Sequence, residues 1–289
     1  MAVFVREAVS HNHFKLLQEL YGRDLGGERF LHWKHLLDPH CGAPMEKTGI
    51  FYKDQERYLG MFVSSFYPFK INELSFNVNM LGDLGIHRQV KSSTVLKDFF
   101  LQARRSDVAA DICFSDDRKI RVYEKIFRKY LTTNTQIYPF VELTLKPDKF
   151  MAFRFTEGDQ ARQASFINNL GREKDHRAFE YIEKHPLYHK IHYINKGNLY
   201  AVIGCSSECA ELLDISNPSR ECFSWAIGVC RHLHSRCKVM IPIGFYKSIC
   251  AQAAEVIAEK RINMLIGYYS EKISELMPKE VWVCRMDLR

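Results

Sequence analysis

The sequence predicts an α/β protein of the mixed α+β kind, in which a mostly antiparallel sheet is flanked by helices. Three observations support this class. Segments with strand-like alternation are interleaved with segments that have helical apolar stripes. In the first half their order is strand, helix, helix, three strands, helix, strand, helix, strand, which favours a mixed sheet with helices on both faces. The second half has a similar order and therefore predicts a tandem repeat.

The strongest strand pattern covers residues 73–86, where every second residue from Leu74 to Met80 is apolar and the residues between them are polar. One buried and one polar face are expected. The alternation breaks at Leu81-Gly82 and then resumes. Such a break is typical of a β-bulge beside a ligand site, and a plain strand end gives nearly the same pattern.

The other elements of the first half follow from the same two periodicities. Helices are expected where apolar residues recur on one face, and the polar turn at residues 54–56 joins two strands as a hairpin. The expected strands are residues 2–6, 48–53, 58–66, 110–114 and 136–144, and the expected helices are residues 13–20, 29–37, 92–104 and 118–130.

The polar segment Lys146-Pro147-Asp148-Lys149 is interpreted as a linker, which divides the chain into domains 1–146 and 147–289. In the second domain the expected strands are residues 150–155, 188–194, 199–204, 211–215, 238–243, 263–268 and 281–285. The expected helices are residues 160–170, 177–184, 220–234 and 246–259.

Composition limits the class of protein. Of the 289 residues 46% are hydrophobic and 26% are charged, which excludes a disordered chain. The net charge of +7 comes without a basic run, so a modest preference for anionic ligands is expected and a nucleic-acid partner is not. Nine cysteines are too few and odd in number for a disulfide scaffold, which favours the cytoplasm. Neither a signal peptide nor a membrane span is expected.

A candidate anion site lies at residues 82–96. There a strand leads through a basic turn into a helix whose start carries hydroxyl residues. Free backbone N–H groups and the positive end of the helix dipole then converge on one place, which binds phosphate. Arg88 and Lys91 add full charges, as a pyrophosphate requires. The alternative is a solvated basic turn without a ligand.

This window and residues 111–127 together resemble the GCN5-related N-acetyltransferase (GNAT) superfamily. That family has an Arg/Gln-x-x-Gly-x-Gly/Ala turn after one strand and a Tyr-Glu-Lys-hydrophobic-Gly-Phe signature on a later helix. Arg88 falls on the first position of the turn, and Tyr123 to Ile126 fall on the helix signature. The resemblance covers about residues 1 to 145. In the turn, Lys91 and Ser93 replace the family's glycines.

The resemblance implies two tandem acyl-CoA N-acyltransferase-like domains, the second of them degenerate. It also implies direct transfer of an acetyl or other acyl group from coenzyme A to a primary amine in a ternary complex. The backbone near Leu84 to Ile86 would pair with the pantetheine arm like an added strand. The cofactor-binding residues implied are Leu84, Gly85, Ile86, Arg88, Gln89, Val90, Lys91, Ser92, Ser93 and Thr94.

Two catalytic residues are implied as well. Tyr123 would lie near the sulfur and protonate the leaving thiolate, or it is a core tyrosine. Asp83 is the first candidate for the base that deprotonates the amine, with Glu73 and His87 as further candidates. Asp83 could equally be a turn residue held by backbone amides.

Several alternatives stay open at this level. The lost glycines favour a non-catalytic binding protein with this fold, and a basic surface favours an acyl-carrier protein as donor. The acceptor could be an amino sugar, a small amine or amino acid, or a protein amine. No metal is expected, because no Cys-x-x-Cys pair occurs. The sequence does not indicate the oligomeric state.

Overall fold

The computed structural model describes residues 2–22, 27–38, 47–71, 74–90, 93–132, 134–147, 156–158, 170–172, 176–216, 219–251 and 253–277. Packing divides the chain into two compact units. Unit 1 consists of residues 1–68, 76–137 and 264–276, and unit 2 consists of residues 69–75, 138–263 and 277–289. The expected boundary between residues 146 and 147 stays a prediction, and so does the degenerate repeat.

Unit 1 contains the elements that carry the candidate site. Its strands are β1 (Val3–Ala8), β2 (Lys47–Asp54), most of β3 (Arg57–Ile71), most of β4 (Leu74–Ile86), β5 (Ala110–Ser115) and the ends of β6 (Asn134–Pro147) and β13 (Ala253–Tyr268). Its helices are α1 (Asn12–Tyr21), α2 (Gly27–Leu36), α3 (Ser93–Ala103), α4 (Asp117–Ile126), the π-helix η1 (Phe127–Leu131) and α8 (Glu271–Leu276).

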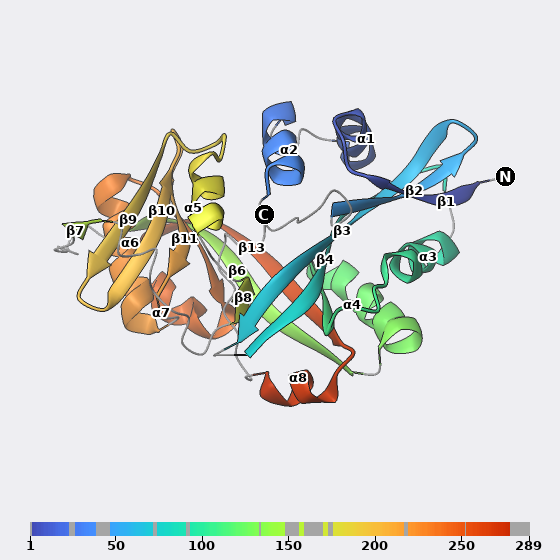
Figure 1. Cartoon of the computed structure of the whole chain (residues 1–289). Helices are drawn as coiled ribbons and strands as arrows, with labels where there is room; N and C mark the ends of the chain where they lie inside the picture. The colour runs from blue at the N-terminus through green and yellow to red at the C-terminus, as the bar shows by residue number, and fades with distance from the viewer. Residues whose placement is uncertain are drawn as a thin grey trace. The chain divides into compact units, whose positions relative to one another are not determined.

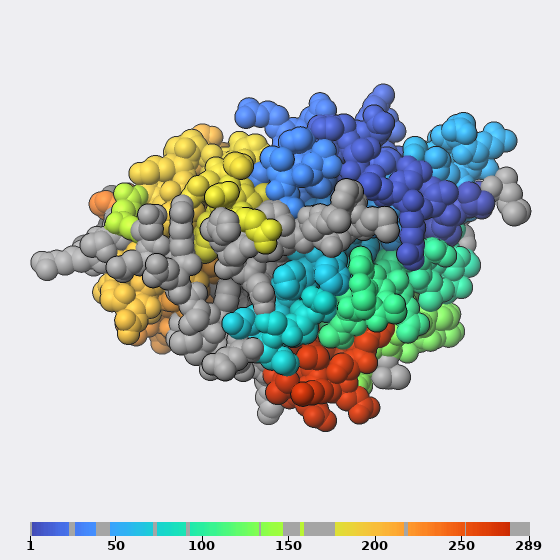
Figure 2. All heavy atoms as spheres, viewed as in Figure 1, coloured from blue at the N-terminus to red at the C-terminus, as the bar shows by residue number. Residues whose placement is uncertain are grey.

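The strands of unit 1 lie in the order β1-β2-β3-β4-β5-β13-β6. Helices α1 and α2 cover one face of the sheet and α3 and α4 the other (Figure 1). Successive residues of β2 divide between the two cores: Phe51 packs with Leu17 of α1, and Ile50 packs with Phe99 of α3. This period-2 division is the reason why the strands of this unit are apolar on both faces. Figure 2 shows α1 and α2 in blue and α3 in green on the visible surface.

Unit 2 has the strand order β13-β6-β12-β11-β10-β9-β7. Its further elements are β7 (Thr156–Glu157), β8 (Leu170–Arg172), α5 (His176–Glu183), β9 (Lys190–Lys196), β10 (Leu199–Cys205), β11 (Ala210–Ile215), α6 (Arg220–Leu233), β12 (Cys237–Pro242), the 3-10 helix η3 (Ile243–Phe245) and α7 (Tyr246–Cys250).

Both units contain a pair of parallel strands joined by a helix. In unit 1 this is β4-α3-β5, and in unit 2 it is β11-α6-β12, where Ala210 pairs with Cys237. Helix α6 begins at Arg220 with Ser219 as its N-cap, whose hydroxyl accepts from the Cys222 N–H, and its apolar face is buried. The end of β3 also belongs to this unit and pairs with β8, with Phe69 opposite Arg172.

One element of the second half differs from the expectation. The helix expected over residues 246–259 ends at Cys250, and β13 begins at Ala253 and continues to Tyr268. The prediction was wrong because alanines favour a helix locally, whereas pairing within the sheet decides the state of this segment. Helix α8 was not expected. The elements expected at residues 150–155 and 281–285 lie outside the described residues, and so does the helix expected at 160–170 except for Leu170, which begins β8.

Candidate functional site

The end of β4 separates from its parallel neighbour β5. Their register runs from Val78 opposite Ala110 to Leu81 opposite Cys113, and β4 then continues to Ile86. Asp83, just past the last pair, has a φ of 51°, which is rare outside glycine. This irregularity lies next to Leu81-Gly82, where the break in alternation predicts a bulge.

Backbone geometry decides which edge of β4 is open. The His87 N–H, directly after β4, donates to the Leu59 carbonyl of β3 over 2.8 Å. Because alternate residues of a strand direct their N–H and C=O groups to the same edge, Gly85 also faces β3. The backbone groups of Leu84 and Ile86 therefore point to the opposite edge, where the register with β5 has already ended.

The turn after β4 is short and exposed. The Val90 N–H donates to the His87 carbonyl over 2.8 Å, and Arg88 and Gln89 at its tip are exposed. Helix α3 follows and begins at Ser93, which is exposed like Thr94. The expected phosphate residues Lys91 and Ser92 lie outside the described residues, as does Glu73.

Tyr123 lies on α4 above the same apolar cluster as the end of β4. Its ring packs on Phe100 with 5.1 Å between the centroids, and Leu84 and Ile86 pack against the same cluster. Burial raises the pKa of Tyr123 to about 12, the nearby Cys113 adds to this shift, and a hydrogen bond with Ser115 opposes it. The phenol therefore keeps its proton at neutral pH and can donate it.

Asp83 points to the other face of β4, toward α2. Its carboxylate accepts a hydrogen bond from Lys34 Nζ over 2.8 Å, and His35 Nε2 lies 3.4 Å away. Burial raises the pKa of Asp83, but the charge of Lys34 and its hydrogen bond outweigh burial and hold the pKa at about 2. A carboxylate with so low a pKa is a weak base. The role of Asp83 as general base stays a prediction.

The polar cluster around Asp83 extends along α2. Burial lowers the pKa of His35 well below its usual range, so this imidazole is neutral. Lys47 Nζ contacts the Asp38 carboxylate at 3.6 Å and donates to the Lys34 carbonyl. These residues are not predicted from the sequence, because nothing in the helical pattern of α2 marks Lys34 or His35 as partners of a residue in β4.

A second cluster of buried polar side chains, centred on Asn79, lies near the start of the pairing between β4 and β5. Asn79 donates to Asp111 over 2.8 Å and accepts from Ser64 over 2.6 Å, and Tyr269 donates to the other oxygen of Asp111. Burial raises the pKa of Asp111 to about 6, although the hydrogen bonds from Tyr269 and Asn79 lower it. Asn79 was expected on a polar face. It is fully buried because both faces of β4 are covered.

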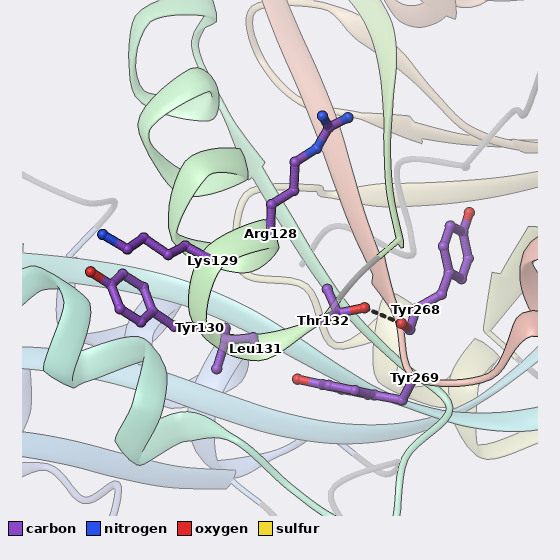
Figure 3. A pocket seen from close by; sticks show the side chains of 7 residues that line it. All are labelled: Arg128, Lys129, Tyr130, Leu131, Thr132, Tyr268 and Tyr269. Carbon is purple, nitrogen blue, oxygen red and sulfur yellow. Dashed lines mark hydrogen bonds between the residues drawn. The ribbon is translucent and has the colours of Figure 1, made fainter.

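A pocket of about 350 Å³ is lined in part by Tyr269, the hydrogen-bond partner of Asp111 (Figure 3). It is formed by η1 and the end of β13, and Thr132 donates a hydrogen bond to the Tyr268 carbonyl at its floor. Arg128 and Lys129 contribute cations, but Arg128 is held by Glu124 at 3.1 Å. None of the site residues expected from the sequence lines this pocket.

The described residues hold no group of three His, Cys, Asp or Glu side chains arranged to bind a metal ion. Within the same part of the chain, no helix is both long and apolar enough to cross a membrane.

Solved structures of low sequence identity share this architecture. A conserved protein from Enterococcus faecalis V583, described as a probable N-acyltransferase, matches at 10% identity and a TM-score of 0.58 over 92% of this chain and 72% of that chain. A putative acetyltransferase from Pyrococcus horikoshii matches at 12% identity and a TM-score of 0.58, over 91% of this chain and 89% of that chain. A GCN5-related N-acetyltransferase from Kribbella flavida matches at 7% identity and a TM-score of 0.52, over 92% and 71%.

Neither a family model nor a curated protein matches the sequence. The shared feature is thus the arrangement of strands and helices: a mixed α+β architecture with a large, mostly antiparallel sheet. This chain has the fold of the GCN5-related N-acetyltransferases.

Proposed function

We propose that this protein is an acyltransferase that moves an acetyl or other acyl group from coenzyme A to a primary amine, using unit 1 as the donor-binding part. One observation carries the proposal: β4 extends past its last pair with β5 and presents the backbone groups of Leu84 and Ile86 at an open edge. A pantetheine arm contains amide groups that can pair with such an edge as an added strand does.

The turn after this edge supports the same donor. Arg88 and Gln89 are exposed directly after β4, and α3 begins five residues after Arg88. A pyrophosphate at this place would gain the charge of Arg88 and the N–H groups at the start of α3. The proposed cofactor-binding residues therefore remain Leu84 to Ile86 and Arg88 to Thr94. For Lys91 and Ser92, which lie outside the described residues, the proposal rests on the sequence alone.

In the proposed reaction a neutral amine attacks the thioester carbonyl directly. A backbone N–H at the open edge of β4 polarises that carbonyl, and the phenol of Tyr123 donates its proton to the thiolate that leaves. Tyr123, whose pKa is raised mainly by burial, is protonated at neutral pH, as this role requires, and the same shift makes it a weaker acid than a free phenol. The proton of the amine passes to a base, for which Asp83 is the sequence candidate, or to water.

The first experiment is calorimetric titration of the whole chain with acetyl-CoA and with free coenzyme A. We expect both to bind, and we expect Arg88→Ala to weaken both by about tenfold or more, because a charge-assisted phosphate contact is worth about 1.5–3 kcal/mol. Arg236→Ala removes the same charge from an exposed position in unit 2 and should leave both affinities unchanged. If neither ligand binds the unaltered chain, the proposal is wrong.

A further inference from the structure

An amine of this chain already lies at the place where the proposed reaction needs one. The proposed thioester carbonyl belongs at the open edge of β4 that begins at Leu84, and the preceding residue, Asp83, holds the ammonium group of Lys34 at 2.8 Å. Lys34 comes from α2 on the face of the sheet opposite to Tyr123. A nucleophile from this face and a proton donor from the other would flank the same strand end.

The side chain of Lys34 is more exposed than those of the neighbouring His35 and Lys47. The side chain of Lys34 is 23% exposed and that of Asp83 is 16% exposed, so both can be reached from outside. The side chain of His35 is 0% exposed, and that of Lys47 is 8% exposed and faces Asp38. Of the described lysines of unit 1 that form ion pairs, Lys34 is the one held beside the open edge of β4.

We propose that Lys34 is an internal acceptor, acylated on Nζ by the acyl thioester that the same chain binds. This inference rests on the proposed function. The ammonium group of Lys34 first releases a proton to water. The neutral Nζ then attacks the carbonyl carbon, a C–N bond forms and the C–S bond breaks. The thiolate takes a proton from Tyr123, the amine releases one proton to water, and the phenol regains its proton from water. The products are an amide on Lys34 and free coenzyme A.

The product differs from the starting state in charge. Acylation removes the positive charge that lies 2.8 Å from Asp83, and this charge is the main cause that lowers the pKa of that carboxyl. The modified chain therefore has an acidic group at the open edge without its lysine partner, which favours a cationic amine as a second acceptor.

The test is to incubate the full chain with acetyl-CoA and to follow acetylation of each lysine by peptide mass spectrometry. Lys53 is an internal control of similar exposure: its side chain is 18% exposed and pairs with Glu7 at 3.6 Å, on a strand that does not border the open edge, and its Nζ also lies 4.3 Å from the centre of the Tyr58 ring. We expect Lys34 to be acetylated at least about tenfold faster than Lys53, owing to its position beside the bound thioester.

Three further readouts separate this reaction from chemical acetylation in solution. The rate constant at Lys34 should not change when the protein is diluted, since donor and acceptor belong to one chain. Arg88→Ala should slow acetylation of Lys34 at limiting acetyl-CoA and leave Lys53 unaffected. Lys34→Arg should abolish the fast incorporation seen by intact mass, whereas Lys53→Arg should retain it.

The outcomes separate this inference from the proposed function. If the chain binds acetyl-CoA in the calorimeter but Lys34 is acetylated no faster than Lys53, the inference is wrong and the proposed function stands. If the chain binds no acetyl-CoA, both fail together. Should Lys34→Arg not fold, the site-resolved rates on the unaltered chain still decide.

Discussion

The pKa values of two aspartates in the β4–β5 region are shifted in opposite directions, because the side chains that contact them differ. Asp83 faces the ammonium group of Lys34, which stabilises the charged form, and its pKa falls to about 2. Asp111 accepts hydrogen bonds from the neutral groups of Asn79 and Tyr269, and these bonds together with the charge of Arg104 do not outweigh burial, so its pKa rises to about 6. The same residue type thus keeps a charge in one place and tends to lose it in the other.

Asp111 should make stability depend on pH. Its folded pKa is higher than its unfolded pKa, so its contribution is fully present below about pH 4 and is lost as pH rises through about 6. The loss amounts to roughly 3 kcal/mol at neutral pH. The unaltered chain should lose free energy of unfolding between pH 4 and 7, and Asp111→Asn should not show this loss. The measurement is urea unfolding of both proteins across this pH range. Asp54→Asn, at the exposed end of β2, is the control, and a pH-independent difference for Asp111→Asn would contradict the assignment.

Tyr123→Phe tests the role of the phenol. It removes the hydroxyl and retains the ring on Phe100, so the fold should be conserved. If Tyr123 protonates the thiolate, turnover should fall by about 10²-fold or more while the calorimetric affinity for acetyl-CoA changes little. Ser115→Ala is a milder companion, since it removes only the hydrogen-bond partner. Unchanged turnover in Tyr123→Phe would assign this residue to the core.

At the scale of elements, the close packing of α1 on β4 positions the open edge. A Cβ added to Gly85 would lie 2.7 Å from the Cβ of Leu20 on α1, which is closer than real side chains approach. Gly60 of β3 is packed as tightly, because its added Cβ would lie 2.9 Å from Phe99 and 3.2 Å from the Gly85 carbonyl. Small residues here let the helix and the strands come together, and this sets where Asp83 and Leu84 lie.

Gly85→Ala should therefore destabilise the protein by about 1–3 kcal/mol, because the nearest atom, the Cβ of Leu20, cannot move without shifting the helix backbone. Gly82→Ala on the same strand is the matched control: its added Cβ meets nothing within 4 Å. The measurement is the midpoint of urea or thermal unfolding of the two variants. Equal stability of both would show that α1 does not constrain this strand as described.

At the scale of the molecule, the two compact units are not continuous in sequence. Residues 264–276 pack into unit 1 although they follow most of unit 2 in the chain. In this segment the side chains from Met264 to Ile266 and that of Tyr268 are buried. Tyr269 then joins β5 through its N–H to the Ala109 carbonyl and through its hydroxyl to Asp111. The sequence-based domain 1–146 therefore lacks part of the packing of unit 1.

A fragment of residues 1–146 should consequently not fold cooperatively by itself. Without residues 264–268 the edge of β5 loses a strand, and each missing buried side chain removes about 2 kcal/mol of burial. We expect the fragment to lack a cooperative unfolding transition, and a peptide of residues 260–277 to restore one partly. A fragment as stable as the full chain would show that this segment is dispensable.

The sequence by itself determined the elements of the first half, whereas the place of the donor site stays a prediction. Alternation in β4 and the apolar stripes of α3 and α4 are local patterns, and they need no distant contact to be recognised. The break near Leu81 lies where the register of β4 with β5 ends and next to Asp83, whose φ is positive.

Only the tertiary structure decided the rest. Segment 253–259 has helix-favouring alanines and is nevertheless a strand, since pairing in the sheet stabilises it more than local propensity. Asn79 belongs to the polar positions of β4 and is nevertheless buried, and its side-chain amide forms hydrogen bonds with Asp111 and Ser64. Lys34 and Asp83 are 49 positions apart, and folding alone brings them to 2.8 Å. Burial and charge pairing depend on contacts between distant residues, and a local pattern does not contain them.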